Sequence, residues 1–294
     1  MHWRLSPSRT LDLSTPRIMA ILNITPDSFA DGGEHLHVDA ALAHAMRCVD
    51  EGAAMLDIGG ESTRPGAASV SDAEQIDRVV PVIRAIRAST HAASNVPISI
   101  DTTRAAVAAA ALDAGADAIN DVSAGTDDAA MLPLAVQRRC GVILMHRLRP
   151  PGLDQFSDAY TAPPAYADVV TDVLAYLRAR VAVALTAGIA RDCIVLDPGL
   201  GFGKSVADNL RLIARTSELL TDRLPILSAL SRKSFVGRVS LNRDSTPAER
   251  LEGTLALSVL HYRHGCRLFR VHDIAPHAAA LAATHALATT ANPP

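Results

Sequence analysis

PISIDTTRAAVAAAALDAGADAIND, residues 97–121, is the stretch that decides the fold of this chain. Its two ends, 97–100 and 117–119, are short runs rich in Ile, as expected of strands that are buried on both faces. Between them, the Ala-rich segment 104–114 has helical periodicity, and Gly115 follows it where glycine commonly ends a helix. The stretch therefore predicts a strand, a helix and the next strand of an α/β fold.

The same alternation recurs along the rest of the chain. Further strands are predicted at 18–22, 54–58, 141–145, 193–196, 225–230 and 267–271, and further helices at 38–51, 71–87, 127–139, 166–187, 207–220, 247–264 and 276–288. We interpret Gly52, Gly141, Gly188 and Gly265 as helix-ending glycines too. Eight such units predict a single-domain TIM (β/α)8 barrel over residues 17–291, with an open doubly wound sheet as the alternative. Residues 1–16 are predicted to be an N-terminal extension that covers the bottom of the barrel.

Composition excludes several classes of protein. Apolar residues make up 49% of the chain, charged residues 20%, and the formal net charge is −3, which is ordinary for a globular protein. Nothing in this balance indicates a nucleic acid or a membrane as partner, and no apolar run reaches the roughly 18 residues of a membrane span. Because the N-terminus lacks the apolar segment of an export signal, we expect a cytoplasmic protein. The four cysteines are predicted to be buried thiols, with disulfides or a metal site as alternatives.

Polar side chains follow almost every predicted strand at its C-terminal end, where the active site of a TIM barrel lies. A single Asp or Asn in such a place is more often a helix cap. Arg and Lys cannot cap a helix N-terminus, so the cationic residues at 232–233 and 270–272 predict an anionic ligand. An internal salt bridge from Arg270 to Asp273 or Glu61 is the alternative. The polar residues at strand ends are Asn23, Asp57, Glu61, Thr63, Arg64, Asp101, Asn120, Asp121, His146, Asp197, Ser231, Arg232, Lys233, Arg270 and His272.

The glycine-rich segment DPGLGFGKS, residues 197–205, has to be tested as a nucleotide-binding loop. A Walker A loop needs glycine five positions before its Gly-Lys pair, and Pro198 occupies that position. The dinucleotide fingerprint fails as well, because the glycines stand at 199, 201 and 203. We interpret the segment as a loop whose glycines let the backbone approach a flat ligand, with simple turn glycines as the alternative.

Taken together, several segments resemble the dihydropteroate synthase family, in family order. They are ILNITPDSFADGG (21–33), DIGGESTRPGA (57–67), residues 100–125, LDPGLGFGKS (196–205), LSRKSFVG (230–237) and RVHD (270–273). The resemblance covers roughly residues 17–275 and implies a TIM barrel, in agreement with the strand count. It also implies a transferase of folate synthesis that joins a dihydropterin methylene diphosphate to p-aminobenzoate and releases diphosphate.

The resemblance further implies how the pterin diphosphate is bound. The pterin edge would meet a group of strand-end residues, which are Asp101, Asn120 and Asp197, and Lys233 would reach the pterin carbonyl and a ring nitrogen. The diphosphate would meet polar and cationic side chains, which are Asn23, Thr63, Arg270 and His272. Mg²⁺ is the implied cofactor, bound near Asn23, which would be its metal ligand.

The implied p-aminobenzoate pocket consists of residues from four loops, which are Phe29, Thr63, Arg64, Pro65, Phe202 and Ser231. The implied catalytic residues are Asp101, Lys233, Arg270 and His272. We expect the loops that carry Phe29 and Arg64 to close late and shield the reaction from water. The two small-molecule substrates are the expected partners, and the family resemblance implies a homodimer.

Two rivals and one departure stay open at this point. A pterin-binding methyltransferase domain shares the barrel and the pterin carboxylates, but it has no diphosphate to neutralise, so the cationic residues at 232–233 and 270–272 argue against it. A catalytically inactive paralogue would be expected to have lost part of the residue set, which is complete here. After Met145 and His146 the chain reads RLRPPG, which departs from the family pattern and leaves the conformation of residues 147–160 open.

Overall fold

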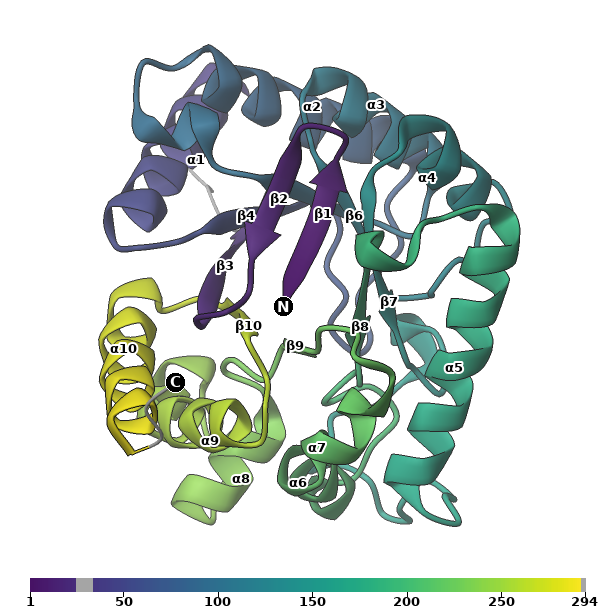
Figure 1. Cartoon of the computed structure of the whole chain (residues 1–294), viewed down its shortest axis with the longest axis vertical. Coiled ribbons are helices and arrows are strands. Elements are labelled where there is room, and N and C mark those ends of the chain that lie inside the picture. Colours follow the sequence, from purple (N-terminus) through teal and green to yellow (C-terminus); the bar gives the residue numbers. More distant parts are fainter. Residues whose placement is uncertain (25–33, 292–294) are drawn as a thin grey trace.

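A computed structural model describes residues 1–24 and 34–291 of the chain, and within them the strands form a closed parallel barrel surrounded by helices (Figure 1). Its strands are β3 (Arg17–Asn23), β4 (Met55–Gly59), β5 (Ile98–Asp101), β6 (Ala118–Asp121), β7 (Gly141–Met145), β8 (Ile194–Asp197), β9 (Leu227–Ser228) and β10 (Leu268–Val271). The sheet order is β8-β7-β6-β5-β4-β3-β10-β9, and a parallel bridge from Leu196 to Ile226 joins its two ends. The TIM barrel prediction is confirmed, and the open sheet is wrong.

The helices lie outside the barrel, between successive strands. They are α1 (Glu34–Asp50), α2 (Asp72–Ala88), α3 (Ala105–Ala114), α4 (Met131–Arg138), α5 (Val169–Ala187), α6 (Val206–Ala214), α7 (Thr216–Leu219), α8 (Ser234–Leu241), α9 (Leu251–Arg263) and α10 (Ile274–Ala291). The sequence prediction missed α8, which is only 8 residues long and contains Gly237. It also missed the break between α6 and α7, where Arg215 leaves the helical region with φ −110° and ψ 23°.

Glycines with positive φ follow the ends of four barrel helices as predicted, at Gly52, Gly115, Gly188 and Gly265. Gly115 and Gly188 stand after α3 and α5 with φ of 114° and 108°, a left-handed conformation that costs glycine little. The prediction for Gly141 is wrong, because Arg139 ends α4 with φ 52° and Gly141 begins β7. A Cβ at Gly141 would lie 2.9 Å from Nε1 of Trp3, so glycine is needed there for packing.

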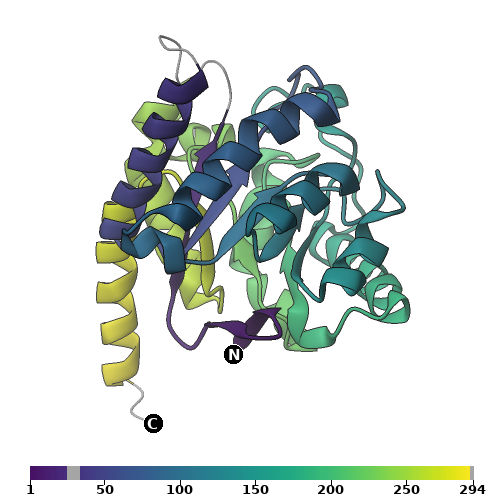
Figure 2. The same ribbon diagram turned by 90° about the horizontal axis from the view of Figure 1, so that it is seen from above.

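The first residues form a β-hairpin, β1 (His2–Ser6) and β2 (Arg9–Asp12), across the bottom of the barrel (Figure 2). Its Trp3 and Leu5 side chains are fully buried and pack with the interior residues Met19, Met55 and Ile143. The Trp3 indole donates a hydrogen bond to the carbonyl of Cys193 at 2.9 Å. The hairpin therefore seals the lower end of the barrel, which confirms the predicted place of this extension and leaves the upper end for a site.

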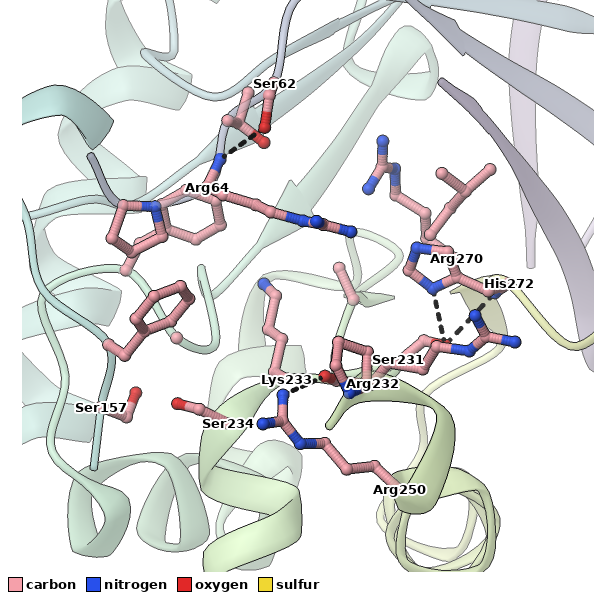
Figure 3. A pocket seen from close by; sticks show the side chains of 18 of the residues that line it. Ser62, Arg64, Ser157, Ser231, Arg232, Lys233, Ser234, Arg250, Arg270 and His272 are labelled. Atoms are coloured by element: carbon pink, nitrogen blue, oxygen red, sulfur yellow. Dashed lines mark hydrogen bonds between the residues drawn. The ribbon is translucent and has the colours of Figure 1, made fainter. Parts of the chain in front are cut away.

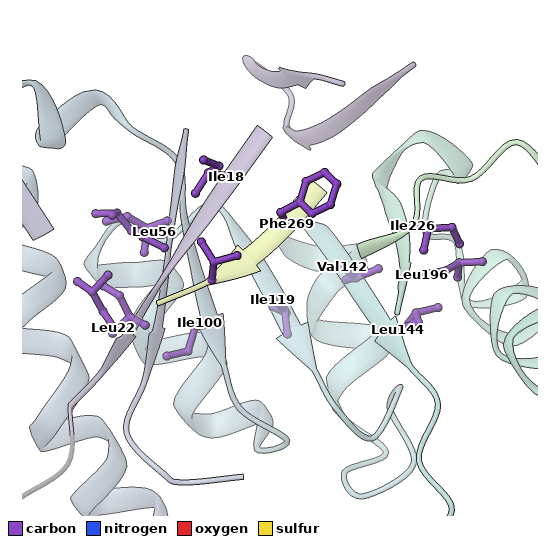
Figure 4. Close-up of a cluster of buried hydrophobic side chains, with 14 of the residues drawn as sticks. Ile18, Leu22, Leu56, Ile100, Ile119, Val142, Leu144, Leu196, Ile226 and Phe269 are labelled. Atoms are coloured by element: carbon purple, nitrogen blue, oxygen red, sulfur yellow. The ribbon is translucent and has the colours of Figure 1, made fainter. Parts of the chain in front are cut away.

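Side chains alternate along the strands between the barrel interior and the helices. Ile18, Leu22, Ile100 and Phe269 belong to the helix-facing core (Figure 4), whereas Met19, Met55 and Leu268 face inward at the bottom. All four cysteines are buried and free, as predicted. Within the described residues no helix combines the length and apolar character that crossing a membrane would need.

Candidate active site

A cavity of about 350 Å³ opens at the C-terminal ends of the strands (Figure 3). Its walls come from β3, from the loops after β4, β7, β8 and β9, and from β10. Its lining includes Asn23, Ser62, Thr63, Arg64, Pro65, Phe156, Ser157, Asp158, Phe202, Ser231, Arg232, Lys233, Ser234, Arg250, Arg270 and His272. The Arg64 and Lys233 side chains both extend toward the middle of this pocket. Ten of the residues that the sequence predicted, counting Pro65 and Arg232, therefore share one pocket.

Beneath the pocket, Arg270 joins the interior faces of three other strands. Its Nε donates to Asp57 at 2.5 Å, and its Nη2 donates to Asp101 at 2.6 Å. Asp57 is fully buried and also accepts from Ser99 at 2.5 Å and from the Asn120 amide at 3.1 Å. The alternative salt bridge from Arg270 to Asp273 or Glu61 is wrong. Arg270 on β10 instead binds the inward-facing carboxylates of β4 and β5, and Asn120 of β6 binds the same Asp57 carboxylate.

Asp101 is the member of this network whose charge is most open to change. Oδ2 accepts from Arg270, but the buried Oδ1 has no hydrogen-bond partner among the described residues. Burial raises the pKa of Asp101 to about 7, against the opposing effect of Arg270, and the neighbouring Asp57 raises it further. Asp101 therefore has one free buried acceptor and a proton affinity suited to neutral pH.

Asp197 ends β8 and begins the glycine loop. Oδ1 accepts a hydrogen bond from the backbone of Gly199 at 2.6 Å, and the carboxylate is almost completely buried. Burial raises the pKa of Asp197, and the nearby charge of Lys233 opposes that rise. The loop then turns back so that Lys233 Nζ lies 4.5 Å from the centre of the Phe202 ring and donates to the Leu200 carbonyl. Burial lowers the pKa of Lys233 to about 8, and Asp197 opposes that change.

At the other side of the pocket, Ser231 orients His272. The Ser231 hydroxyl oxygen accepts from the His272 backbone at 3.2 Å and lies 3.1 Å from Nδ1 of its ring. Burial lowers the pKa of His272 to about 3, and Arg270 lowers it further. A neutral ring that accepts the Ser231 proton at Nδ1 carries its own proton on Nε2, so His272 can donate one hydrogen bond.

Two of the cationic groups that predicted an anionic ligand already have carboxylate partners. Arg232 binds Asp273 through two hydrogen bonds of 2.9 Å and 2.5 Å, and Arg270 binds Asp57 and Asp101. The prediction that Arg232 and Arg270 need an anionic ligand to compensate their charges is therefore wrong, because carboxylates of the fold already do so. Arg64, which is exposed, and Lys233 remain directed at the cavity.

The remaining predicted residues fall in two groups. Asp101, Asn120 and Asp197 lie just below the pocket lining, each less than a tenth exposed, at the ends of neighbouring strands β5, β6 and β8. Phe29 lies outside the described residues, so its predicted place in the p-aminobenzoate pocket stays a prediction.

Sequence reasoning missed one wall of the pocket. Phe156, Ser157 and Asp158 line it, and they belong to the segment 147–160 whose conformation was left open. That segment is tied to the glycine loop, because Asp154 accepts from the Gly203 backbone at 2.7 Å. Because the chain departs from the family pattern directly before this segment, no prediction was made for this wall.

Two further residues, for which no particular role was predicted, support the pocket from behind. Asp57 was predicted only as a polar residue at a strand end, and it is the centre of the buried network. Arg250 lines the pocket and donates to the Arg232 carbonyl at 2.8 Å. This contact helps to hold Arg232 in its left-handed conformation, φ 59°, which is unusual for a residue other than glycine. No sequence signal pointed to Arg250.

Asn23 could supply one neutral oxygen ligand to the predicted magnesium ion. Mg²⁺ usually takes one or two protein oxygens and completes its shell with water and substrate phosphates. Asn23 presents a neutral amide to the pocket, and its Oδ1 would lie 3.8 Å from a Cβ built at Gly59. Across residues 1–24 and 34–291, no group of three or more His, Cys, Asp or Glu could form an all-protein metal cage. An ion held here would depend on the ligand for most of its coordination.

Comparisons with known proteins agree with this geometry. Residues 19–272 match the family described as "Pterin binding enzyme". The dihydropteroate synthase of Bacillus subtilis (strain 168) is 42% identical over 257 residues, which cover 87% of this chain and 83% of that protein. The solved Xanthomonas albilineans dihydropteroate synthase with 4-aminobenzoic acid has 41% identity and a TM-score of 0.86, covering 98% of this chain and 99% of that one. The Yersinia pestis enzyme in a sulfonamide drug complex has the same identity and TM-score over 98% of this chain and 100% of that one.

The barrel, its polar upper end and these likenesses define the class, and the chain belongs to the pterin-binding enzyme family. Within that class its function is that of the dihydropteroate synthases, which are transferases of folate synthesis. The relatives named above are all synthases, so neither the methyltransferase reading nor the inactive paralogue is favoured.

Proposed function

We propose that this pocket binds a 6-hydroxymethyl-7,8-dihydropterin diphosphate and p-aminobenzoate and joins them, with release of diphosphate. The observation that carries the proposal is the pair of buried carboxylates beneath the pocket. Asp101 keeps an acceptor without a partner, and Asp197 lies at the mouth of a glycine loop. A pterin edge offers donors that pair with such carboxylates, because its ring NH and amino group lie side by side.

The two ends of the pocket would then divide the substrates. The pterin would lie low in the barrel, with Asp197, Asn120 and Asp101 at its edges and Lys233 at its carbonyl. The diphosphate would lie toward Asn23, Thr63 and the Nε2 proton of His272. The p-aminobenzoate would lie between the Phe202 ring and the loops that carry Arg64, Pro65 and Ser231.

The proposed reaction breaks one bond and forms another, and the residues of the pocket would stabilise the charges that develop. The bond from the pterin methylene to the diphosphate oxygen breaks, and its electron pair leaves with the diphosphate. The amine nitrogen of p-aminobenzoate then forms the new bond to that methylene and loses a proton. Buried carboxylates can stabilise positive charge on the pterin, and the fixed groups around the diphosphate can stabilise negative charge, both without reorganisation. When bound, Mg²⁺ would neutralise part of the charge on the departing diphosphate.

Competition with the reaction product tests this division of the pocket. 7,8-Dihydropteroate combines the pterin and the p-aminobenzoate halves, so it should displace both substrates in a titration of the purified protein. A control ligand, 6-hydroxymethylpterin, should displace only the pterin diphosphate. Displacement of neither substrate by dihydropteroate would contradict the proposed arrangement.

Activity should fall as the pH drops through about 7, because Asp101 then takes up a proton and can no longer stabilise positive charge on the pterin. The carboxylate form, which we expect to be the active one, predominates above that pH. Asp101→Asn should lower kcat/KM and remove this acidic limb. The pH profile of kcat/KM for both proteins measures the effect, and an unchanged limb in the variant would assign it to another group.

Removal of divalent metal should abolish the condensation. Diphosphate is a poor leaving group while its charge is uncompensated, and the cationic side chains Arg232 and Arg270 are already paired with carboxylates. Product formation should stop in excess chelator and return with added Mg²⁺. Full activity in chelator would mean that protein side chains suffice.

Sulfonamides should compete with p-aminobenzoate and not with the pterin diphosphate, since they share the shape and charge of the former. The apparent inhibition constant should rise linearly with the p-aminobenzoate concentration. Arg64→Ala should weaken both the drug and the substrate if the Arg64 loop covers this end of the pocket. Inhibition that excess p-aminobenzoate fails to relieve would count against a shared pocket. The homodimer and the cytoplasmic location stay predictions.

A further inference from the structure

Lysine is rare in this chain, and one copy lines the candidate active site while the other lies behind its glycine loop. The 28 cationic residues counted as Lys and Arg comprise 26 arginines and only two lysines, Lys204 and Lys233. A chain that uses arginine at nearly every cationic position keeps an ammonium at these two. Lys233 faces the pocket, where the proposed function gives it a role. Lys204 lies behind the glycine loop and has none so far.

Lys204 is fully buried and holds two segments together. Its Nζ donates to the Phe202 carbonyl at 2.9 Å and to Nδ1 of His146 at 2.9 Å, and it lies 3.4 Å from the His146 carbonyl. The glycine loop after β8 is thereby fastened to the residue that follows β7. Packing here is tight, since a Cβ at Gly199 would lie 1.8 Å from the His146 carbonyl and 3.3 Å from Lys204 Nζ.

The three acceptors suit an ammonium and not a guanidinium. A lysine has three donors on one tetrahedral nitrogen, whereas arginine has five donors in a planar fork, and two of them would be left unpaired here. No carboxylate forms an ion pair with Lys204 in the part of the chain that the structure describes. A buried cation without such a partner is costly, so its presence calls for a reason beyond packing.

The nearest functional group is the Asp197 carboxylate, which begins the same loop. Burial lowers the pKa of Lys204 to about 7, and the charge of Asp197 is the largest effect opposing that change. Burial of the His146 ring, together with the nearby charge of Lys204, lowers the pKa of His146 to about 2. The ring therefore stays neutral and accepts the hydrogen bond from Lys204. The hydrogen bonds of Lys204 therefore hold the glycine loop, and its charge acts on the Asp197 carboxylate.

We propose that Lys204 is a positioning residue for pterin recognition. Its buried ammonium fixes the Phe202 carbonyl against His146, and its charge helps to keep Asp197 in the carboxylate form that accepts the pterin donors. This inference rests on the proposed function of Asp197. It goes beyond that proposal because Lys204 itself does not line the pocket.

Other charges face these two groups and must be kept in view when pH is varied. Around Asp197 they are Lys204, Lys233, Arg270 and Asp101, and around Lys204 they are Asp154, Asp197, Asp208, Lys233 and the His146 ring. Lys204 and Asp101, with pKa values of about 7, and Lys233, with a pKa of about 8, change their protonation near neutral pH. The variant and its control therefore have to be compared at each pH.

The test compares Lys204→Met with Arg211→Met. Methionine keeps the length of the side chain and removes its charge, while Arg211 is an exposed cation on α6 whose loss controls for net charge. Binding of 6-hydroxymethylpterin is measured by calorimetry at pH 7 and pH 9. We expect Lys204→Met to weaken binding roughly tenfold at pH 7, the scale of one charged hydrogen bond, and less at pH 9, where the Lys204 ammonium of the wild type has largely lost its own proton. The Arg211→Met variant should bind like the wild type at both pH values.

A second measurement uses the wild-type protein and does not depend on how well the variant folds. Lysine labelled with ¹³C at Cε should give two side-chain signals, one for each lysine. We expect the signal of Lys204 to titrate well below that of free lysine and to move when pterin saturates the protein. A folded Lys204→Met that binds pterin within twofold of wild type at both pH values overturns the inference, as does a Lys204 signal indifferent to pterin. Failure of the wild type to bind pterin would instead contradict the proposed function.

Discussion

Asp197→Ala should abolish pterin binding while the protein stays folded. The loss should reach on the order of a hundredfold or more, because two donors of the pterin edge lose a charged acceptor, each worth about 1.5–3 kcal/mol. Stability should change by only ~1–2 kcal/mol, since the residue contacts a loop rather than the core. Calorimetry with 6-hydroxymethylpterin and thermal unfolding measure the two effects.

Asp197→Asn is the matched variant that separates recognition from loop structure. An asparagine keeps the oxygen that accepts from the Gly199 backbone, now 2.6 Å away, but it lacks the charge and the second acceptor. It should therefore keep the loop and still fail to bind pterin. Normal binding by Asp197→Asn would make this residue a loop cap, and an unfolded Asp197→Ala would make it mainly structural.

Arg270→Ala should have the largest effect on stability of any change at the site. It leaves Asp57 and Asp101 without their cation inside the barrel, and breaking a buried ion pair in this way costs about 3–5 kcal/mol. Because Asp101 loses its orientation as well, both the pterin diphosphate and the pterin alcohol should bind more weakly. Denaturant unfolding and calorimetry with both ligands measure these losses.

A double variant shows whether the loss of stability comes from uncompensated charge. Arg270→Met with Asp57→Asn removes one cation and one buried carboxylate together, so it should recover much of the stability that Arg270→Ala loses. Pterin binding should not recover. If Arg270→Ala were as stable as the wild type and weakened the diphosphate alone, Arg270 would act on the diphosphate directly and its internal ion pairs would matter little.

The fold could be predicted because its signals are local. The alternation of Ile-rich runs with Ala-rich helices in residues 97–121 recurs along the chain, and each strand placed its polar C-terminal residue at the same end. Side chains alternate along β10, so Arg270 points inward while Val271 joins the helix-facing core. Strand ends alone thus located most of the candidate site.

The features that could not be predicted depend on contacts between distant segments. The partners of Arg270 are set by the stagger of β10 against β4 and β5, 213 and 169 residues away in sequence, and no local pattern encodes that stagger. The wall formed by Phe156 and Ser157 depends on contact between its segment and the glycine loop, where Asp154 accepts from the Gly203 backbone. The buried Lys204 belonged to a motif that was interpreted through its glycines alone.

The central claim is that this pocket joins a pterin diphosphate to p-aminobenzoate, and the condensation itself is the most direct measurement. Purified protein is incubated with both substrates and Mg²⁺, and dihydropteroate and diphosphate are quantified over time. We predict equal amounts of the two products, with no diphosphate released when p-aminobenzoate is left out. Absence of dihydropteroate from a folded protein that binds both substrates would contradict the claim, as would diphosphate release that needs no p-aminobenzoate.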